Sequence, residues 1–353
     1  MFSSQSKEGK KGRVTKASAI LLGGFLLVTF SLSTFAGMSP EEGDADIYLR
    51  PDSIPQPSNN LLTSERVELG KMLFFDPRLS GSNWISCGLC HNPALGWSDG
   101  LKTAIGHKMQ TLERSTPTIL NTAYQNFQFW DGRERSLEKQ ALGPIVSPGE
   151  MAQDLDELIK ELKAVPGYVM LFKKAYPKEG VSKAAIAKAL SSFQRTIVSQ
   201  DSDFDRWLKG MDSDMSKSAK RGFALFKGKA RCIMCHNGFN FADSGFHNIG
   251  LPNNHDEGRY RIKPVKVLKG AFKTPTLRDV ALTAPYMHNG EFETLAQVIE
   301  HYNSGGKKNM GNLDPNMVKL GLSKKEKADL LQFLLSLTGD AVEVSIPQLP
   351  VNH

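Results

Sequence analysis

The feature that most constrains this chain is a pair of identical five-residue motifs of the form Cys-x-x-Cys-His. One spans residues 87–91 and the other residues 232–236, and together they use all four cysteines of the 353-residue sequence. This spacing is typical of covalent c-type haem attachment, in which both thiols add to the haem and the adjacent histidine reaches the iron. The sequence therefore predicts two haems, held by Cys87, Cys90, His91, Cys232, Cys235 and His236.

Two other uses of paired cysteines fit the sequence less well. A zinc site usually places its second cysteine pair about 12–20 residues after the first. Here the second pair begins at Cys232, far along the chain from Cys90, so only folding could unite the pairs. A thioredoxin-like dithiol needs a strand–helix–strand setting, which the sequence does not show. Haem attachment is therefore the favoured interpretation of both motifs.

Residues 1–36 have the pattern of an export signal. Five basic residues precede an apolar run from Ala17 to Phe30, and a region of small residues ends at Ala36. This order predicts a signal peptide that is cleaved after Ala36. An uncleaved membrane anchor is the alternative, because the segment is about long enough to span a bilayer. In either case we expect the remaining chain to be exported to the periplasm.

The exported part carries little net charge. Without the five Lys/Arg residues and one Glu of residues 1–36, the formal net charge falls from +7 to +3. The sequence also lacks a stripe of Lys and Arg interleaved with aromatic residues, which is typical of nucleic-acid-binding proteins. We therefore expect no nucleic-acid partner.

Helical patterns dominate the exported part, and strand-like alternation is scarce. Residues 323–337, for example, begin with the capping box Ser-x-x-Glu and continue with apolar residues at helical spacing. The pattern predicts a mostly α protein with long loops.

A weak internal repeat divides the chain into two halves. A Thr-Pro-Thr segment occurs in each half, at Pro117 and at Pro275. The separation from Pro117 to Trp130 equals the separation from Pro275 to His288, and each copy follows one haem motif. The sequence therefore predicts two cytochrome c-like haem domains after the signal segment. They comprise residues 37–205 and residues 206–353.

From residue 69 to residue 339 the sequence resembles the bacterial di-haem cytochrome c peroxidases and the related MauG-type di-haem enzymes. The resemblance rests on several motifs that occur in the family's order. They are the two haem motifs, Gly106-His107, Phe129-Trp130-Asp131-Gly132-Arg133, Gln140 with Pro144, Glu150-Met151 and the block from Thr274 to Gly290.

The resemblance implies different roles for the two haems. The N-terminal haem, held by His91, would react with peroxide, and the C-terminal haem, held by His236, would store or relay an electron. Glu150 matches the family's distal acid, which moves a proton between the two peroxide oxygens. Gln140 matches a distal amide that hydrogen-bonds the bound oxygen, and Trp130 matches a tryptophan that lies between the haems.

Sixth iron ligands are also implied by the resemblance. His107, in the loop that follows the first haem motif, matches the removable ligand of the N-terminal haem. At the C-terminal haem the family's ligand stands at a fixed separation after the histidine of the Pro-Tyr-x-His block, and counting from His288 leads to Tyr302. MauG-type enzymes have tyrosine at this position and the peroxidases have methionine. Met287 is the main alternative, and His288 and His301 are further candidates.

Calcium between the haems is a further implication. Family members bind it through backbone carbonyls that match Thr283 and Pro285. Their third protein ligand is usually asparagine, whereas Ser115 stands in that register here and could act through water.

Two functions follow from the resemblance. The first is a periplasmic di-haem peroxidase that reduces hydrogen peroxide to water with electrons from a small c-type cytochrome or a copper protein (cupredoxin). The alternative is a MauG-type enzyme that uses peroxide-derived high-valent haem to oxidise a protein substrate. A cytochrome that only carries electrons is disfavoured, because Glu150, Gln140 and Trp130 all fall in register. Relatives dimerise, so we also expect a homodimer.

Overall fold

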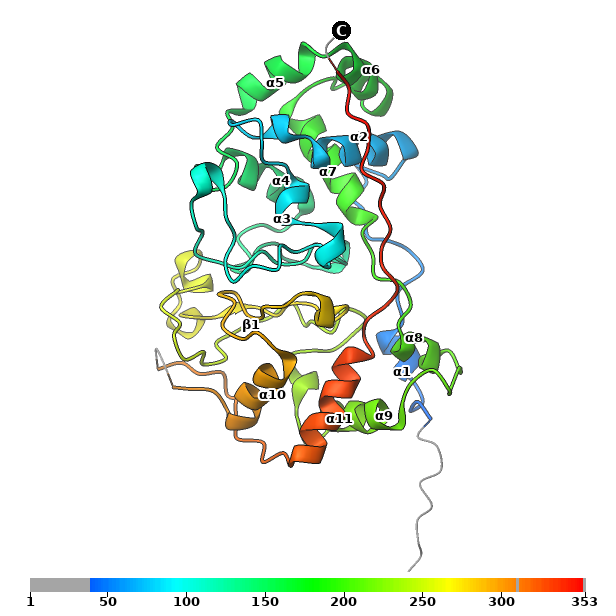
Figure 1. Cartoon of the computed structure of the whole chain (residues 1–353), viewed down its shortest axis with the longest axis vertical. Helices are drawn as coiled ribbons and strands as arrows, with labels where there is room; N and C mark the ends of the chain where they lie inside the picture. Colours follow the sequence, from blue (N-terminus) through cyan, green and yellow to red (C-terminus); the bar gives the residue numbers. More distant parts are fainter. Residues whose placement is uncertain (1–38, 309–310, 352–353) are drawn as a thin grey trace, which may run out of the picture. The chain divides into compact units, whose positions relative to one another are not determined.

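The computed structural model describes residues 39–308 and 311–351. The predicted signal segment, residues 1–36, lies outside these ranges, so its cleavage stays a prediction. Within the described ranges no helix has both the length and the apolar character that crossing a membrane requires. The described residues form one compact unit, which consists of two helical halves (Figure 1).

Eleven α-helices, eight short 3₁₀ helices and one two-stranded antiparallel sheet form the regular structure of the described residues. The first half contains α2 (Ser64–Phe75), α3 (Cys87–Cys90), α4 (Leu137–Val146), α5 (Leu155–Lys163), α6 (Pro166–Ala175) and α7 (Lys183–Arg195). The second half contains α1 (Asp44–Tyr48), α8 (Asp203–Leu208), α9 (Lys217–Lys227), β1 (Phe246–His247), β2 (Phe272–Lys273), α10 (Leu295–Ser304) and α11 (Lys324–Leu335). Long loops connect these elements. The expected mostly α architecture is confirmed.

The first half is built around the crossing of α2 and α7. Gly70 allows the two backbones to approach closely, because a Cβ atom there would lie 1.9 Å from the carbonyl oxygen of Ala189. Helix α7 starts after Ser182, whose side chain accepts a hydrogen bond from the N–H of Ala185. Apolar side chains of both helices, with those of α4 to α6, form the core of this half.

The second half repeats this arrangement with α9 and α11. A Cβ atom at Gly222 would lie 2.0 Å from the carbonyl oxygen of Asp329, so a glycine again marks the crossing. The predicted capping box is present at the start of α11, between Ser323 and Glu326. An aromatic cluster fills the core of this half, formed by Tyr48, Phe204, Phe223, Phe226, Phe241 and Phe333.

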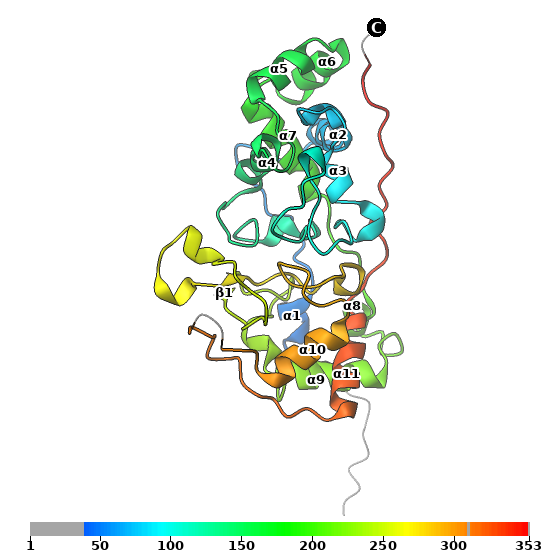
Figure 2. The same cartoon turned by 60° about the vertical axis from the view of Figure 1, so that its left-hand side comes forward.

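Each end of the described chain packs on the half that is more distant in sequence. Tyr48 of α1 stacks on Phe241 of the second half, with ring centroids 5.1 Å apart. The C-terminal residues 340–351 run back along the first half (Figures 1 and 2). There the guanidinium of Arg78 donates a hydrogen bond of 2.9 Å to the carbonyl of Pro350. The two halves therefore exchange their ends, and the domain limits expected from the sequence stay a prediction.

Candidate functional site

One cavity of about 700 Å³ is lined by both Cys-x-x-Cys-His motifs. Its walls come from the two motif turns and from the loops that face each other where the halves meet. Apolar side chains of α4, α10 and α11 complete the lining. Both predicted haem sites therefore open into one continuous space.

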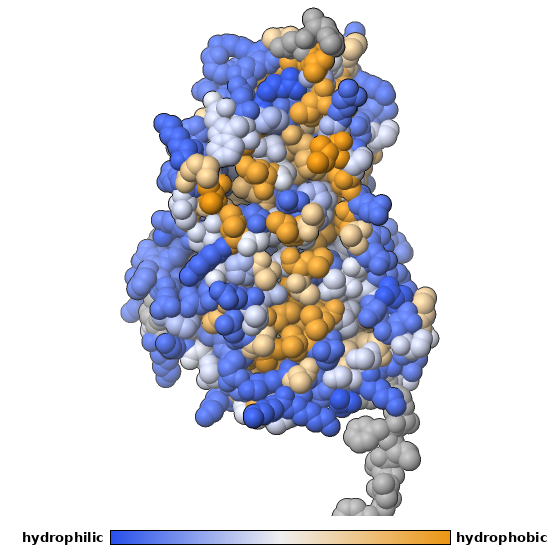
Figure 3. All heavy atoms as spheres, viewed as in Figure 1, coloured by the Kyte–Doolittle hydropathy of each residue, from blue (hydrophilic) through white to orange (hydrophobic). Residues whose placement is uncertain are grey.

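The two motifs fold in the same way. In each, the histidine N–H donates a hydrogen bond of 2.8 Å to the carbonyl of the first cysteine, Cys87 or Cys232. One tight turn therefore presents both thiols and the imidazole to the cavity. The residue before the second cysteine points outward, since Leu89 is 49% exposed and Met234 is 51% exposed. Figure 3 shows apolar side chains at the surface of both halves.

The two motif histidines are oriented as iron ligands. Nδ1 of His91 lies 3.2 Å from the carbonyl oxygen of Trp97, and Nδ1 of His236 lies 2.7 Å from that of Phe241. A carbonyl on Nδ1 fixes the tautomer and leaves Nε2 free to bind a metal. Burial lowers the pKa of both imidazoles, that of His236 to about 4. Both are therefore neutral at neutral pH, the form that ligates iron, and both sites fit a c-type haem.

Gln140 and Glu150 lie together on the lining of the cavity in the first half. Gln140 is on α4, and its Oε1 atom is buried without a hydrogen-bond partner in the described structure. After α4 ends at Val146 the chain turns back, and the N–H of Glu150 donates to the carbonyl of Ser147 at 3.1 Å. The unpaired amide oxygen leaves a hydrogen-bond acceptor on this wall for a polar group that enters the cavity.

His107 lies beside the Glu150 turn. Its N–H donates a hydrogen bond of 3.0 Å to the carbonyl of Gly149, and a Cβ atom at Gly106 would lie 2.0 Å from the same oxygen. The imidazole of His107 is not among the described side chains that line the cavity. Its Nδ1 atom is buried without a hydrogen-bond partner in the described structure, and a role of His107 as an iron ligand stays a prediction.

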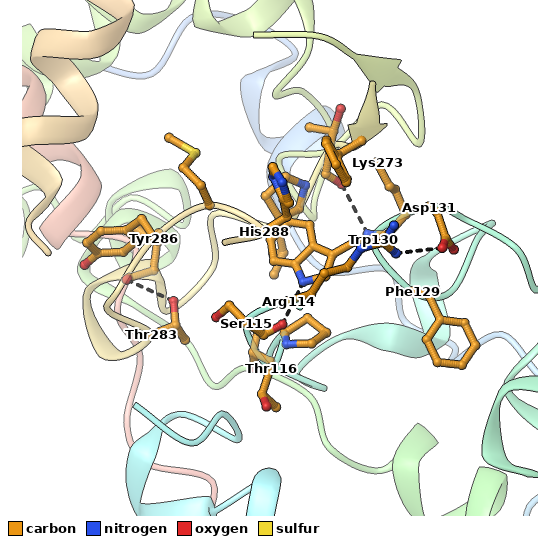
Figure 4. Close-up of a pocket in the computed structure, with 18 of the residues that line it drawn as sticks. Arg114, Ser115, Thr116, Phe129, Trp130, Asp131, Lys273, Thr283, Tyr286 and His288 are labelled. Carbon is orange, nitrogen blue, oxygen red and sulfur yellow. Dashed lines mark hydrogen bonds and ion pairs between the residues drawn. The ribbon is translucent and has the colours of Figure 1, made fainter. Parts of the chain in front are cut away.

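Trp130 connects the two halves (Figure 4). Its indole N–H donates to the carbonyl of Ser115 at 2.9 Å, and its own carbonyl accepts from the N–H of Lys273 at 2.8 Å. Its ring lies edge-on to that of His288, with centroids 6.4 Å apart. The backbone of Ser115 also bonds to His288, whose carbonyl accepts its N–H at 2.7 Å. The Trp130 ring therefore lies where loops of both halves meet.

Two of the four candidate ligands of the second site have other partners. The ring of His288 stacks on Phe272 with centroids 3.6 Å apart, and burial lowers its pKa to about 3. His301 is buried, with Nε2 at 2.9 Å from the carbonyl oxygen of Ile249. Both imidazoles are therefore engaged by other groups of the protein.

Tyr302 and Met287 line the cavity. His288 also lies on this wall, but its ring is stacked on Phe272. Tyr302 lies on α10 between the second haem motif and the apolar side chains of that helix. Its hydroxyl has no hydrogen-bond partner among the described residues, and burial raises the pKa of the phenol well above its ordinary value. The side chain is half-buried because it borders the cavity, so its hydroxyl is accessible to a group that enters the cavity.

Comparison with known proteins identifies the family. Residues 64–213 match the family model described as di-haem cytochrome c peroxidase, and residues 219–338 match that of cytochrome c. The methylamine utilization protein MauG of Methylorubrum extorquens is 47% identical over 306 residues, which cover 86% of each chain. This chain belongs to the di-haem cytochrome c peroxidase and MauG family.

Two further relatives extend the comparison. The cytochrome c551 peroxidase of Nitrosomonas europaea is 38% identical over 295 residues, 82% of this chain and 85% of that protein. The crystal structure of a MauG-like protein associated with microbial copper homeostasis has a TM-score of 0.77 at 32% identity. The match covers 83% of this chain and 94% of that one. The resemblance and the two-domain di-haem fold expected from the sequence are therefore confirmed.

Membership of the di-haem family establishes several coarse properties. The chain is a di-haem peroxidase-family oxidoreductase. Its two motifs, at Cys87/Cys90 and Cys232/Cys235, lie in cytochrome c-type regions and imply two c-type haems. The family implies peroxide as a substrate, and a c-type cytochrome is consistent with export.

The residues that match the di-haem family's calcium ligands also meet at the cavity. Thr283, Pro285 and Ser115 all line it. The Ser115 carbonyl already accepts a hydrogen bond from Trp130, and the Thr283 hydroxyl donates to the carbonyl of Val280 at 3.2 Å. The backbone carbonyls of Thr283 and Pro285 are therefore the groups to test for calcium.

Sequence reasoning missed the charged residues of this di-haem site. Arg114 pairs with Asp131 at 2.6 Å and with Asp256 at 2.7 Å, across the two halves. Lys273 lies buried on the cavity wall. A signal was present, because Arg114 and Lys273 stand within two positions of the repeated Thr-Pro-Thr segments.

Proposed function

We propose that this chain is a MauG-type di-haem enzyme that uses hydrogen peroxide to oxidise a protein substrate. The observation that carries the proposal is Tyr302, a half-buried phenol that lines the cavity near Cys232 and Cys235 of the second haem motif. The 47% identity to the MauG of Methylorubrum extorquens supports it. Since that relative is named for methylamine utilization, we place the protein substrate in the same process.

The haems would be held by the two motifs, with His91 and His236 as proximal ligands. When bound, they supply iron at which peroxide is reduced and which holds the resulting oxidising equivalents. A phenolate ligand stabilises ferric and higher oxidation states, whereas a thioether favours ferrous iron. As an iron ligand, Tyr302 would therefore suit a second haem that holds oxidising equivalents, and Met287 would suit one that holds an electron.

The chain's own groups would handle the protons. The Glu150 carboxylate takes the proton of one peroxide oxygen and returns it to the other, which leaves as water. Oε1 of Gln140, unpaired in the described structure, accepts a hydrogen bond from the bound peroxide. Overall, peroxide takes two electrons and two protons and gives two waters, and the two electrons come from a side chain of the substrate protein. Trp130 carries electrons between the halves.

Several finer features belong to the same proposal. Calcium binds where the halves meet, through the backbone carbonyls of Thr283 and Pro285, and Ser115 contributes to the site through water. The haem domains comprise residues 37–205 and residues 206–353, and the exported chain acts in the periplasm as a homodimer.

The decisive experiment adds stoichiometric hydrogen peroxide to the fully ferric, calcium-loaded holoprotein and follows haem absorption within milliseconds. We expect an immediate spectral change, because a Tyr302 ligand would stabilise the oxidised states of the second haem without prior reduction. Tyr302→Met should lose this ferric-state reaction. Tyr286→Phe, which alters another tyrosine on the cavity wall, should retain it.

A second measurement tests the substrate. We expect the mass of a methylamine-utilization protein to change in proportion to the peroxide consumed. In the absorption experiment, a spectral change of the wild-type protein that appears only after one electron is supplied would show that the MauG-type proposal is wrong.

The second candidate is the periplasmic peroxidase that takes electrons from a small c-type cytochrome or copper protein. Two observations favour it. His107 lies beside the Glu150 turn, and Met287 also lines the cavity. In that case the spectral change would require one-electron reduction, and peroxide consumption would be coupled to oxidation of a reduced cytochrome.

A further inference from the structure

Four lysine or arginine side chains are buried among the described residues: Arg195, Lys220, Lys273 and Arg278. Three of them pair with a carboxylate: Arg195 with Glu138 at 2.7 Å, Arg278 with Asp205 at 2.6 Å, and Lys220 with Asp212. Lys273 has no carboxylate within salt-bridge distance in the described structure. Because a buried charge is costly unless it is paired, Lys273 is the exception that requires an explanation.

The contacts of Lys273 are with neutral oxygens. Its ammonium donates to Oε1 of Gln125 at 2.8 Å and to the carbonyl of Thr274 at 3.3 Å. The residue is only 8% exposed, and it belongs to the cavity wall. Burial lowers the pKa of the ammonium to about 8. This cation is therefore positioned for an anion that enters the cavity.

The other cations on the cavity wall are already neutralised or solvated. Arg114 pairs with Asp131 and Asp256, and Arg133 also pairs with Asp131. Of the remaining two arginines, Arg261 is neutralised by its pair with Glu113, and Arg231 is exposed to solvent. Within the described cavity wall, Lys273 is the buried basic side chain whose charge lacks an ionic partner.

The position of Lys273 identifies the anion. It ends β2 of the second half, its ammonium bonds to Gln125 of the first half, and its N–H holds the carbonyl of Trp130. Figure 4 shows Lys273 and Ser115 on opposite sides of Trp130. The groups that two bound haems bring into this space are the propionate carboxylates, which are the anions of the haem itself.

We propose that the ammonium of Lys273 binds a haem propionate where the two halves meet, and thereby favours the reduced state of that haem. Since an adjacent positive charge disfavours the additional positive charge of ferric iron, removal of the ammonium stabilises the ferric state. Lys273 is thus a positioning residue for the cofactor. The inference depends on the two haems alone and holds for a peroxidase and for a MauG-type enzyme.

The test is a spectroelectrochemical titration of the holoprotein in which each haem is followed separately. Lys273→Gln should shift the one-electron equilibrium of one haem at least tenfold toward the ferric state, which lowers its potential by about 59 mV. The haem that shifts is the one whose propionate Lys273 binds. Lys273→Arg keeps the charge and should shift it less than threefold.

Lys269→Gln is the matched control. It removes a positive charge four positions away in the same loop segment, where Lys269 is 41% exposed and pairs with Glu257. Unchanged potentials of both haems in Lys273→Gln would overturn the proposal, and so would an equal shift in the control.

Haem content provides a second readout if Lys273→Gln assembles poorly. Loss of haem in the Gln variant with full content in the Arg variant supports a charge role. Loss in both variants indicates that Lys273 only packs against its neighbours, and the proposal is then wrong.

Discussion

In the first half, His91 faces the cavity with its Nδ1 on a backbone carbonyl, and in the second half His236 does the same. The opposite walls of the two sites differ. The first carries the acid Glu150 and the unpaired amide of Gln140, and the second carries the phenol of Tyr302. Because the histidine sides of the two sites are equivalent, they cannot give the two haems different roles. The side chains on the opposite walls must be responsible for that difference.

The helices that support the two sites are equally similar. A glycine allows close crossing in both halves, at Gly70 in α2 and at Gly222 in α9. The two halves therefore share the helix crossing and the haem motif. They differ in the distal side chains, which come from α4 and the turn after it in the first half and from α10 in the second. The following predictions test where this equivalence ends.

The largest effect is expected at Glu150. Glu150→Gln should slow the reaction with peroxide by 10²-fold or more, because an amide cannot carry the proton between the peroxide oxygens. Stopped-flow mixing of the holoprotein with peroxide measures this rate. Glu113→Gln removes an exposed carboxylate from the same cavity wall and should leave the rate unchanged. Equal rates for wild type and Glu150→Gln would show that Glu150 does not carry the proton and that this wall does not define the peroxide site.

The next effect concerns the shared scaffold. Gly70→Ala and Gly222→Ala should each lower the free energy of unfolding by about 3 kcal/mol or more, since a Cβ at 1.9–2.0 Å from a backbone oxygen forces the helices apart. Chemical denaturation of the holoprotein measures this loss. Gly143→Ala is the control, because its Cβ meets the ring of Phe129 at 3.3 Å and no backbone atom closer. If only one of the two substitutions destabilises the protein, the two helix crossings are not equivalent.

The smallest effect concerns a histidine that distinguishes the second half. His247 lies between Asp243 at 2.9 Å and Asp314 at 2.6 Å. Hydrogen bonding to Asp243, and also to Asp314, raises its pKa to about 11. Asp243 also accepts a hydrogen bond from the hydroxyl of Thr274 at 2.7 Å, and Asp99 of the first half accepts the equivalent bond from Thr116 at 2.6 Å. The histidine is therefore the difference between the halves.

A raised pKa stabilises the folded state most below about pH 6.5, the value of unfolded histidine, and this contribution disappears as the pH rises through about 11. His247→Gln should therefore lower the free energy of unfolding by about 1 kcal/mol at pH 6. The difference from wild type should shrink at pH 8 and again at pH 10, as measured by denaturation at each pH. His255→Gln, at an exposed histidine, should show no such trend. A constant difference at all three pH values would contradict this assignment.

The sequence alone determined the local features of this protein. The two haem motifs, the capping box of α11 and the repeated Thr-Pro-Thr segments depend on short spacings, which fix backbone turns and the nearest ligand atoms. The family resemblance followed from the order of such motifs. The family's separation from His288 led to Tyr302, which lies on α10 in the structure.

Only the tertiary structure decided which distant residues meet. It placed α1 in the core of the second half, returned the C-terminal tail to the first half, and joined Trp130 to Ser115 and Lys273. It also showed that His288 and His301 have other partners and that Lys273 has no carboxylate at salt-bridge distance in the described part of the chain. These contacts depend on how two halves pack over loops of long sequence separation. No short spacing encodes that packing, because burial and pairing are properties of the assembled chain.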